Sequence, residues 1–182
     1  MSDQEDINFN YGFTECPSCD HKMNSITKTI NIPNFGETII FTLTCSNCGY
    51  KTSDLFAVHE KEPIRYILSY TDSRQLIHKI VRSSSCIIRI PELGVEIEPS
   101  FASEGYITNI EGLLLRIKDI TLGLIKILEN DEEIQNGLEV VKNIDSAIDG
   151  NFNFKLILED PKGNSAILTE FEDDSLIKEE IY

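Results

Sequence analysis

The sequence predicts a mixed α+β protein, mainly β, in which a four-cysteine metal ribbon precedes a β-domain that is interrupted by an α-helical hairpin. Two C-x2-C pairs joined by strand-like segments indicate the ribbon. Segments with the two-residue alternation of β-strands lie before position 108 and after position 151, and between them apolar residues recur at spacings of three and four. With 182 residues, of which 41% are apolar, the chain can form one ordinary domain or two small ones.

The cysteine pairs are Cys16 with Cys19 and Cys45 with Cys48, separated by 25 residues (positions 20–44). Each pair can place two thiolates on one ion from a tight turn, and two pairs fill the four tetrahedral positions that Zn²⁺ prefers. Two disulfides would need an oxidising compartment, and a redox C-x-x-C motif is normally a single pair beside a βαβ pattern. The pattern therefore predicts one structural zinc ion, with no open position for catalysis.

Composition restricts the partners and the compartment. The net charge of −15, from 31 acidic and 16 basic residues, repels phosphate backbones, so nucleic acid is disfavoured and a basic protein partner is favoured. No apolar run reaches membrane-spanning length, and the polar start of the chain is not a targeting peptide. Five cysteines, four of them metal ligands, indicate the reducing cytoplasm, and Cys86 in a strand pattern is expected to be a buried, inert thiol.

Along the chain, an acidic tail over residues 1–13 is followed by the zinc ribbon over residues 14–56. Two strand-like segments, 26–32 and 37–44, flank a turn signal at Pro33-Asn34-Phe35-Gly36. The resulting hairpin returns the second cysteine pair to the first.

The predicted β-domain combines residues 57–108 with residues 151–182. The strand-like segments are 64–70, 84–90, 93–98, 152–158 and 165–171, and the final segment 175–182 is either a strand or a tail. Residues 75–82 are ambiguous between helix and strand, with a weak preference for strand. Asp160-Pro161-Lys162-Gly163-Asn164 has the composition of a turn.

Between these parts lies the predicted helical hairpin, residues 109–150. Thr108 and Glu111 form a capping-box pattern, and an apolar stripe follows at Leu113, Ile117, Ile120, Leu124, Ile127 and Leu128. Asn130 and the acidic residues after it cap a second helix, and Gly150 ends that helix. At about 1.5 Å per residue, each arm is expected to span about 30 Å.

Four motifs in this order resemble the ZPR-type zinc-finger family, over about residues 14–168. They are Cys45-Ser46-Asn47-Cys48-Gly49-Tyr50-Lys51, Ile88-Arg89-Ile90-Pro91-Glu92-Leu93, Glu111-Gly112-Leu113-Leu114 and Leu158-Glu159-Asp160-Pro161-Lys162-Gly163-Asn164-Ser165. The resemblance implies an antiparallel double-stranded β-helix-like domain that bears the helical hairpin. Eukaryotic members carry two such modules, whereas this chain has one, as archaeal members do. Members often have glycine after the first cysteine pair, where this chain has Asp20-His21.

The resemblance also implies a function, because eukaryotic members bind translation elongation factor 1-alpha and act in its folding. We therefore expect a non-enzymatic protein that binds this factor and no nucleotide of its own. The aromatic residues Phe35, Tyr50 and Phe56 in or beside the ribbon are candidate partner contacts, although Tyr50 and Phe56 are equally well explained by packing against the β-domain.

Two alternatives remain open at this level. One is a zinc-ribbon accessory factor in transcription or nucleic-acid binding, which would use a local basic patch at residues 22–28. The other is a barrel enzyme with a second metal, which is disfavoured because His21, His59 and His78 are dispersed along the chain.

Overall fold

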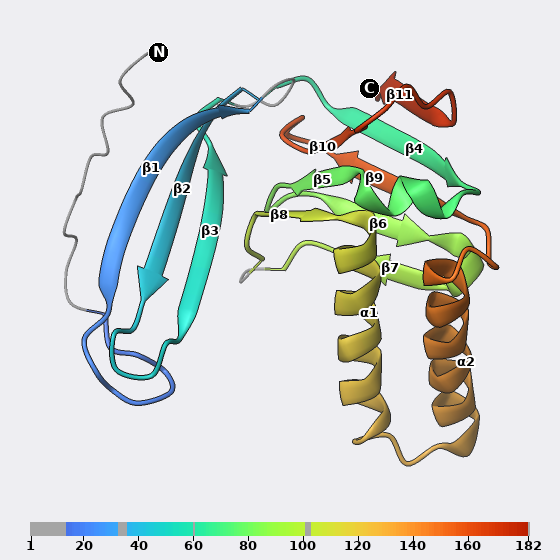
Figure 1. Cartoon of the computed structure of the whole chain (residues 1–182), viewed down its shortest axis with the longest axis horizontal. Helices are drawn as coiled ribbons and strands as arrows, with labels where there is room; N and C mark the ends of the chain where they lie inside the picture. The colour runs from blue at the N-terminus through green and yellow to red at the C-terminus, as the bar shows by residue number, and fades with distance from the viewer. Residues whose placement is uncertain (1–13, 33–35, 60, 101–102, 182) are drawn as a thin grey trace.

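The protein consists of two arms that extend from the same side of a β-domain (Figure 1). One arm is the ribbon sheet and the other is the helical hairpin, and the β-domain connects them. The computed structural model describes residues 14–32, 36–59, 61–100 and 103–181.

The ribbon arm is an antiparallel sheet of three strands in the order β1-β2-β3. Its strands are β1 (Asn24–Ile32), β2 (Gly36–Thr44) and β3 (Lys51–Ala57). The first two lie where the alternation predicts them. The third was not predicted as a strand, because its first four residues are all polar and only Leu55, Phe56 and Ala57 are apolar. It forms by pairing with β2, in a register that places Ile40 opposite Leu55.

The β-domain has two antiparallel sheets around one core. One sheet has the order β10-β5-β8 and the other has the order β11-β4-β9-β6-β7. The first sheet contains β5 (Lys79–Arg82), β8 (Tyr106–Asn109) and β10 (Ala166–Leu168). The second contains β4 (Ile64–Tyr70), β6 (Ile87–Ile90), β7 (Val95–Ile97), β9 (Phe154–Asp160) and β11 (Leu176–Glu180). This architecture confirms the expected double-stranded β-helix-like, or jelly-roll, domain.

Strict alternation defines the buried and exposed faces of the larger sheet. In β4, Ile64, Tyr66, Leu68 and Tyr70 are buried. On the opposite face, charged side chains form one row of ion pairs across all five strands, in the order Glu179, Arg65, Glu159, Arg89 and Glu96. The sequence pattern predicted the apolar face, but the partners in this row come from distant segments.

Local geometry corrects three of the predicted elements. Residues 75–82 are not one strand: a 3₁₀ helix, η1 (Ser73–Ile77), precedes β5 because Asp72 and Gln75 form a capping box that starts a helical turn. The strand predicted over residues 84–90 begins only at Ile87. The segment predicted as a strand over 93–98 begins within the 3₁₀ helix η2 (Pro91–Leu93), which ends at Gly94 with a φ of 63°.

The hairpin consists of α1 (Ile110–Ile125) and α2 (Asp131–Ile148). The predicted N-cap of α1 was wrong by one residue, because Thr108 pairs with Ile80 in the sheet and Asn109 caps the helix by accepting a hydrogen bond from the Gly112 N–H. Helices of 16 and 18 residues extend about 24 and 27 Å, somewhat less than expected.

Only the half of the hairpin nearest the β-domain is buried. Leu113 and Ile117 lie in the core, where Tyr70 donates a hydrogen bond of 2.7 Å to the carbonyl of Ala147 at the end of α2. Farther along the predicted stripe, Ile120 is 53% exposed, and the next two stripe positions are exposed as well. The helical period was therefore predicted correctly, but it does not show which part of the stripe is covered.

The ribbon meets the β-domain where β3 approaches β8. The Asp54 carboxylate accepts a 2.8 Å hydrogen bond from the Gly105 N–H, and Leu55 belongs to the core of the β-domain. A Cβ added at Gly105 would collide with the backbone carbonyl of Leu55, so this contact requires glycine. The junction therefore holds the ribbon beside the β8 edge.

Candidate metal centre

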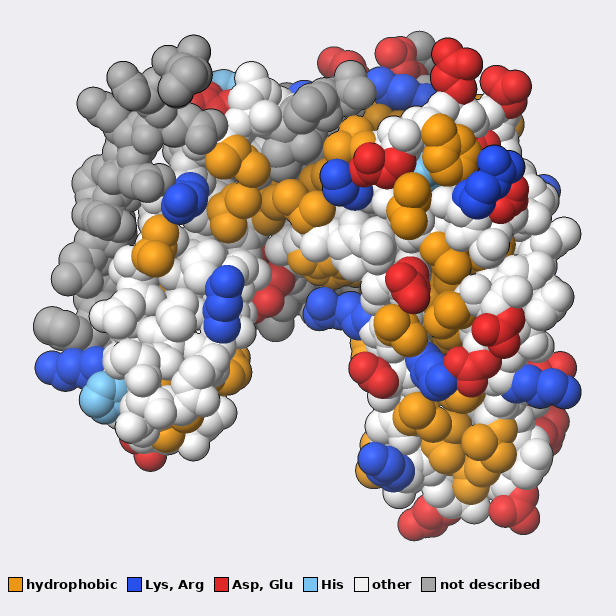
Figure 2. Space-filling view, viewed as in Figure 1, with side chains coloured by type: hydrophobic (Ala, Val, Ile, Leu, Met, Phe, Trp, Pro, Cys, Tyr) orange, Lys and Arg blue, Asp and Glu red, His pale blue; other side chains and the backbone are white. Residues whose placement is uncertain are grey.

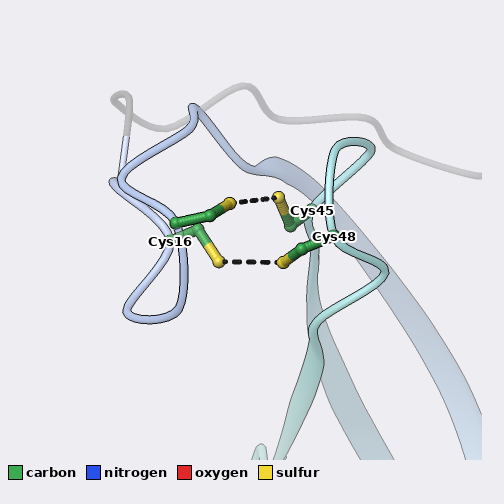
Figure 3. A group of neighbouring side chains, drawn as sticks. Cys16, Cys45 and Cys48 are labelled. Atoms are coloured by element: carbon green, nitrogen blue, oxygen red, sulfur yellow. Dashed lines mark hydrogen bonds between the residues drawn. The ribbon is translucent and has the colours of Figure 1, made fainter.

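The four predicted zinc ligands converge on one point, where Figure 3 labels Cys16, Cys45 and Cys48. The site lies at the end of the ribbon arm that points away from the β-domain (Figure 1). The four sulfur atoms all lie within 4.8 Å of one another. The sulfurs of Cys16 and Cys48 are 3.5 Å apart, and those of Cys19 and Cys45 are 3.6 Å apart. Four sulfurs at about 2.3 Å from one zinc ion would be about 3.8 Å apart in a tetrahedron, so the donor set fits one Zn²⁺.

Two similar turns present the four sulfurs. In the first, the Asp20 N–H donates to the Cys16 carbonyl at 2.9 Å, and in the second the Gly49 N–H donates to the Cys45 carbonyl at 3.0 Å. Asp20 and Gly49 have φ values of 57° and 76°. Aspartate is one of the few residues besides glycine that tolerates this left-handed conformation, so Asp20 supports the same turn that Gly49 forms after the second pair.

Electrostatics at the cluster favour a bound cation. A hydrogen bond from the Asn47 side chain and one from the His21 backbone lower the pKa of Cys19 to about 6. A backbone hydrogen bond from Tyr50 favours the Cys48 thiolate, but burial and the neighbouring cysteines outweigh it and raise the pKa of Cys48 to about 12. Four thiolates this close repel one another, and a divalent ion removes that cost.

The metal centre also substitutes for a hydrophobic core in the ribbon. Its buried cluster consists of Cys16, Met23 and Cys45, against which Leu43 and Tyr50 pack. Such a cluster is too small to hold a fold, whereas a structural zinc ion supplies about 10–16 kcal/mol in zinc-finger peptides. The four cysteines would fill the tetrahedral positions of a bound zinc ion, which would leave no open position for a substrate.

The three predicted partner contacts have different surroundings. Tyr50 is half-buried against the metal cluster, Phe56 is 50% exposed on β3, and Phe35 lies outside the described residues. Their role in binding therefore remains a prediction.

Buried polar clusters elsewhere were missed by the sequence analysis. Asp160 is fully buried and accepts hydrogen bonds from the hydroxyls of Ser83, Ser85 and Ser165 at 2.6–2.7 Å, and from two backbone N–H groups. Burial would raise the pKa of Asp160, but these hydrogen bonds outweigh it and hold the pKa below its usual value of 3.8. The turn composition of residues 160–164 was the only signal that could have indicated this cluster.

A second cluster joins His78 to Asp173. The ring Nδ1 of His78 accepts a hydrogen bond from the Glu170 N–H, so Nε2 carries the proton and donates to Asp173 at 2.9 Å. Within the described ranges, no other histidine and no thiol contributes to this pair, and its two hydrogen bonds link residues 170–173 to the residue that precedes β5. Cys86 is fully buried, and burial raises the pKa of its thiol to about 12, as expected of an inert cysteine.

Comparison with known proteins assigns both the ribbon and the β-domain to domains of one family. Residues 11–62 match the ZPR1 zinc-finger domain, and residues 74–182 match the ZPR1 jelly-roll domain. An uncharacterized ZPR1-like protein of Methanocaldococcus jannaschii is 38% identical over 168 residues, which cover 91% of this chain and 85% of that protein. A ZPR1-like protein of Pyrococcus horikoshii is also 38% identical and covers 92% of this chain.

Eukaryotic proteins match over the same region. The zinc finger chaperone zpr1 of Schizosaccharomyces pombe is 32% identical over 87% of this chain, and the human zinc finger protein ZPR1 is 32% identical over 93% of it. The matched region is 36% and 38% of those two proteins. None of the helices among the described residues is long and apolar enough to cross a membrane.

Proposed function

Because the chain belongs to the ZPR1 zinc-finger family, as a member with one module like the archaeal proteins, we propose that it is a non-enzymatic cytoplasmic protein that binds translation elongation factor 1-alpha and assists its folding. The Schizosaccharomyces pombe relative is named a zinc finger chaperone, which supports a role in folding. The family resemblance is what identifies the factor. The closed zinc site supports binding rather than catalysis, since the metal has no free coordination position.

The observation that carries the proposal is an exposed apolar patch at the free end of the helical hairpin (Figure 2). We call it the hairpin patch and define it by Leu124 and Ile127, three positions apart around the end of α1, which are 51% and 75% exposed. Isolated apolar residues are common on surfaces, but neighbouring ones at the end of a projecting arm are typical of protein-binding sites. Fully covering one such side chain contributes about 1.5–3 kcal/mol.

Beside the hairpin patch, four acidic residues outnumber one exposed lysine, Lys126. Glu129, Asp131, Glu132 and Glu133 are exposed where the two helices join. An apolar centre with a charged rim is the usual arrangement of a transient interface, in which the rim accelerates association with a partner of opposite charge. This arrangement supports a partner with a basic surface and argues against the nucleic-acid alternative.

Calorimetric titration of the zinc-loaded protein into the elongation factor 1-alpha of the same organism tests the proposal, with GDP, with a GTP analogue and without nucleotide. The double substitution Leu124→Ser and Ile127→Ser should weaken binding at least about tenfold, because it removes two anchors. Ile77→Ser is the matched control, since Ile77 is 54% exposed on η1, away from the hairpin patch.

Two results would contradict the proposal. One is an unchanged affinity of the double variant for the factor, which would show that the hairpin patch is not part of the interface. The other is the absence of binding in every nucleotide state, together with no effect of the protein on refolding of the denatured factor. Phe56→Ser, measured in the same titration, tests the predicted ribbon contact separately.

A further inference from the structure

A groove runs between the two arms, and strand β8 forms its floor (Figures 1 and 2). On the ribbon side, a cavity of about 230 Å³ is lined by Asp54, Leu55 and Ile107, among others. On the hairpin side, a cavity of about 410 Å³ is lined by Ile107, Leu115 and Arg116, among others. Because Ile107 lines both cavities, they adjoin along β8.

The floor of this groove is the edge of a sheet. Strand β8 pairs with β5 on one side only. The Ile110 N–H donates to the His78 carbonyl. By the alternation of an antiparallel ladder, the backbone N–H and carbonyl groups of Thr108 and Tyr106 therefore also point toward β5, whereas those of Ile107 point away from it. Among the described residues, none forms a hydrogen bond with the backbone N–H or carbonyl of Ile107.

Neighbouring groups leave room at this edge instead of covering it. Among the hydrogen bonds of the described residues, the edge is capped at Gly105, whose N–H donates to Asp54. Natural sheets protect open edges with charged side chains, proline or a covering element, but the next outward-facing residue is Ile107, whose side chain is 44% exposed. An open edge with an apolar side chain inside a groove is a suitable surface for an added strand.

Charge indicates what this strand should carry. Arg116 lies on the α1 wall of the groove, and its guanidinium carbon is 4.7 Å from the centre of the Tyr106 ring. Arg116 forms no ion pair with any residue in the part of the chain that the structure describes, and this includes Asp119, which lines the same cavity. A carboxylate on the incoming segment would be a fitting partner for this guanidinium.

We propose that the β8 edge binds an extended segment of a partner polypeptide as an added β-strand, in which apolar side chains alternate with acidic ones. The segment forms a pair of backbone hydrogen bonds with Ile107, its apolar side chains contact Ile107 and Leu115, and one of its carboxylates pairs with Arg116. The proposal rests on the proposed function only in requiring that the chain binds proteins, not in the identity of the partner.

The backbone part of the proposal can be tested by removing one N–H. Ile107→Pro removes the outward N–H and none of the hydrogen bonds to β5, and edge strands tolerate proline at such positions. The probe is a fluorescent synthetic peptide that alternates valine and glutamate. Ile107→Pro should weaken its binding about tenfold or more, whereas Ile107→Val, which keeps the N–H, should bind like the unchanged protein. Circular dichroism and zinc content establish that both variants are folded.

Hydrogen exchange of the unchanged protein tests the same point without a substitution. The Ile107 amide should exchange quickly in the free protein and at least about tenfold more slowly with the peptide bound. For the charge, Arg116→Gln should weaken binding, whereas Lys142→Gln, at an exposed position on α2, should not.

The outcomes separate this proposal from the proposed function. If the factor binds but neither the factor nor the peptide slows exchange at Ile107, strand addition is overturned while the proposed function stands. If the peptide binds and protects Ile107 but the factor does not bind, strand addition stands and the proposed function fails. Protection already present in the free protein, and lost on removal of residues 1–13, would assign the edge to the chain's own N-terminal segment and overturn the proposal.

Discussion

Replacement of Asp160 should destabilise the protein strongly, because this carboxylate is the common acceptor of five donors. In Asp160→Ala, the hydroxyls of Ser83 and Ser85 can bond to each other, since their oxygens are 3.0 Å apart. The Lys162 N–H lies at an exposed residue and can bond to water. The donors without a replacement are the hydroxyl of Ser165 and the backbone N–H of Asn164, both of which belong to buried residues.

Each buried donor that loses a charged acceptor costs about 1.5–3 kcal/mol, so Asp160→Ala should lower the free energy of unfolding by about 3–6 kcal/mol. That is a large part of the total stability of a typical domain. Asp160→Asn keeps the shape and one acceptor oxygen and should cost less, about 2 kcal/mol. Urea unfolding followed by circular dichroism measures both values, with Asp119→Ala, an exposed aspartate on α1, as the control.

Acid should reduce the difference between the unchanged protein and Asp160→Asn. The folded-state pKa of Asp160 lies below its usual value of 3.8, so the stability that its charge contributes is fully present above about pH 5. This stability is lost as the pH falls below 3.8 toward the folded-state pKa. Destabilisation of less than about 1 kcal/mol by Asp160→Ala, or a larger effect of Asp160→Asn, would refute the hydrogen-bond argument.

Three further predictions concern the metal and the junction. Chelation of zinc should unfold the metal end of the ribbon arm and leave the β-domain folded, because the buried cluster around the cysteines is separate from the β-domain core that Leu55 joins. Loss of amide dispersion in NMR spectra that is confined to the ribbon and greatest around the cysteine turns would verify this, and global unfolding would contradict it. Asp20→Val should weaken zinc binding while Asp20→Gly keeps or strengthens it, since a β-branched residue resists a φ of 57°. Competition with a zinc-binding dye ranks the zinc affinities of the variants, and equal affinities would oppose the argument. Gly105→Ala should disturb the junction between the ribbon and the β-domain, because the added Cβ would clash with the Leu55 carbonyl. Small-angle scattering should show a changed radius of gyration with unchanged zinc content. An unchanged scattering profile would show that the junction tolerates a Cβ.

Features encoded within a few neighbouring residues were predictable. The metal ligands follow from C-x2-C spacing, because one tight turn places both sulfurs of a pair on one ion. Strand β4 was predicted with the bounds that the structure has, since alternation shows where one face is buried. The Ile110–Ile125 helix was predicted from its period, although its cap was misplaced by one residue and it ends before Ile127 and Leu128, which the predicted stripe included.

Features that depend on distant partners were not predictable. The stripe from Leu113 to Ile127 has one period throughout, but only the tertiary structure decides that its first half enters the core and its second half is exposed. Likewise, the donors Ser83 and Ser85 reach Asp160 across 77 and 75 positions in sequence. The sequence alone determined the metal site and the type of most elements, because these depend on local geometry. The tertiary structure alone decided which apolar faces remain open and which polar groups meet, because burial depends on how separate elements pack together.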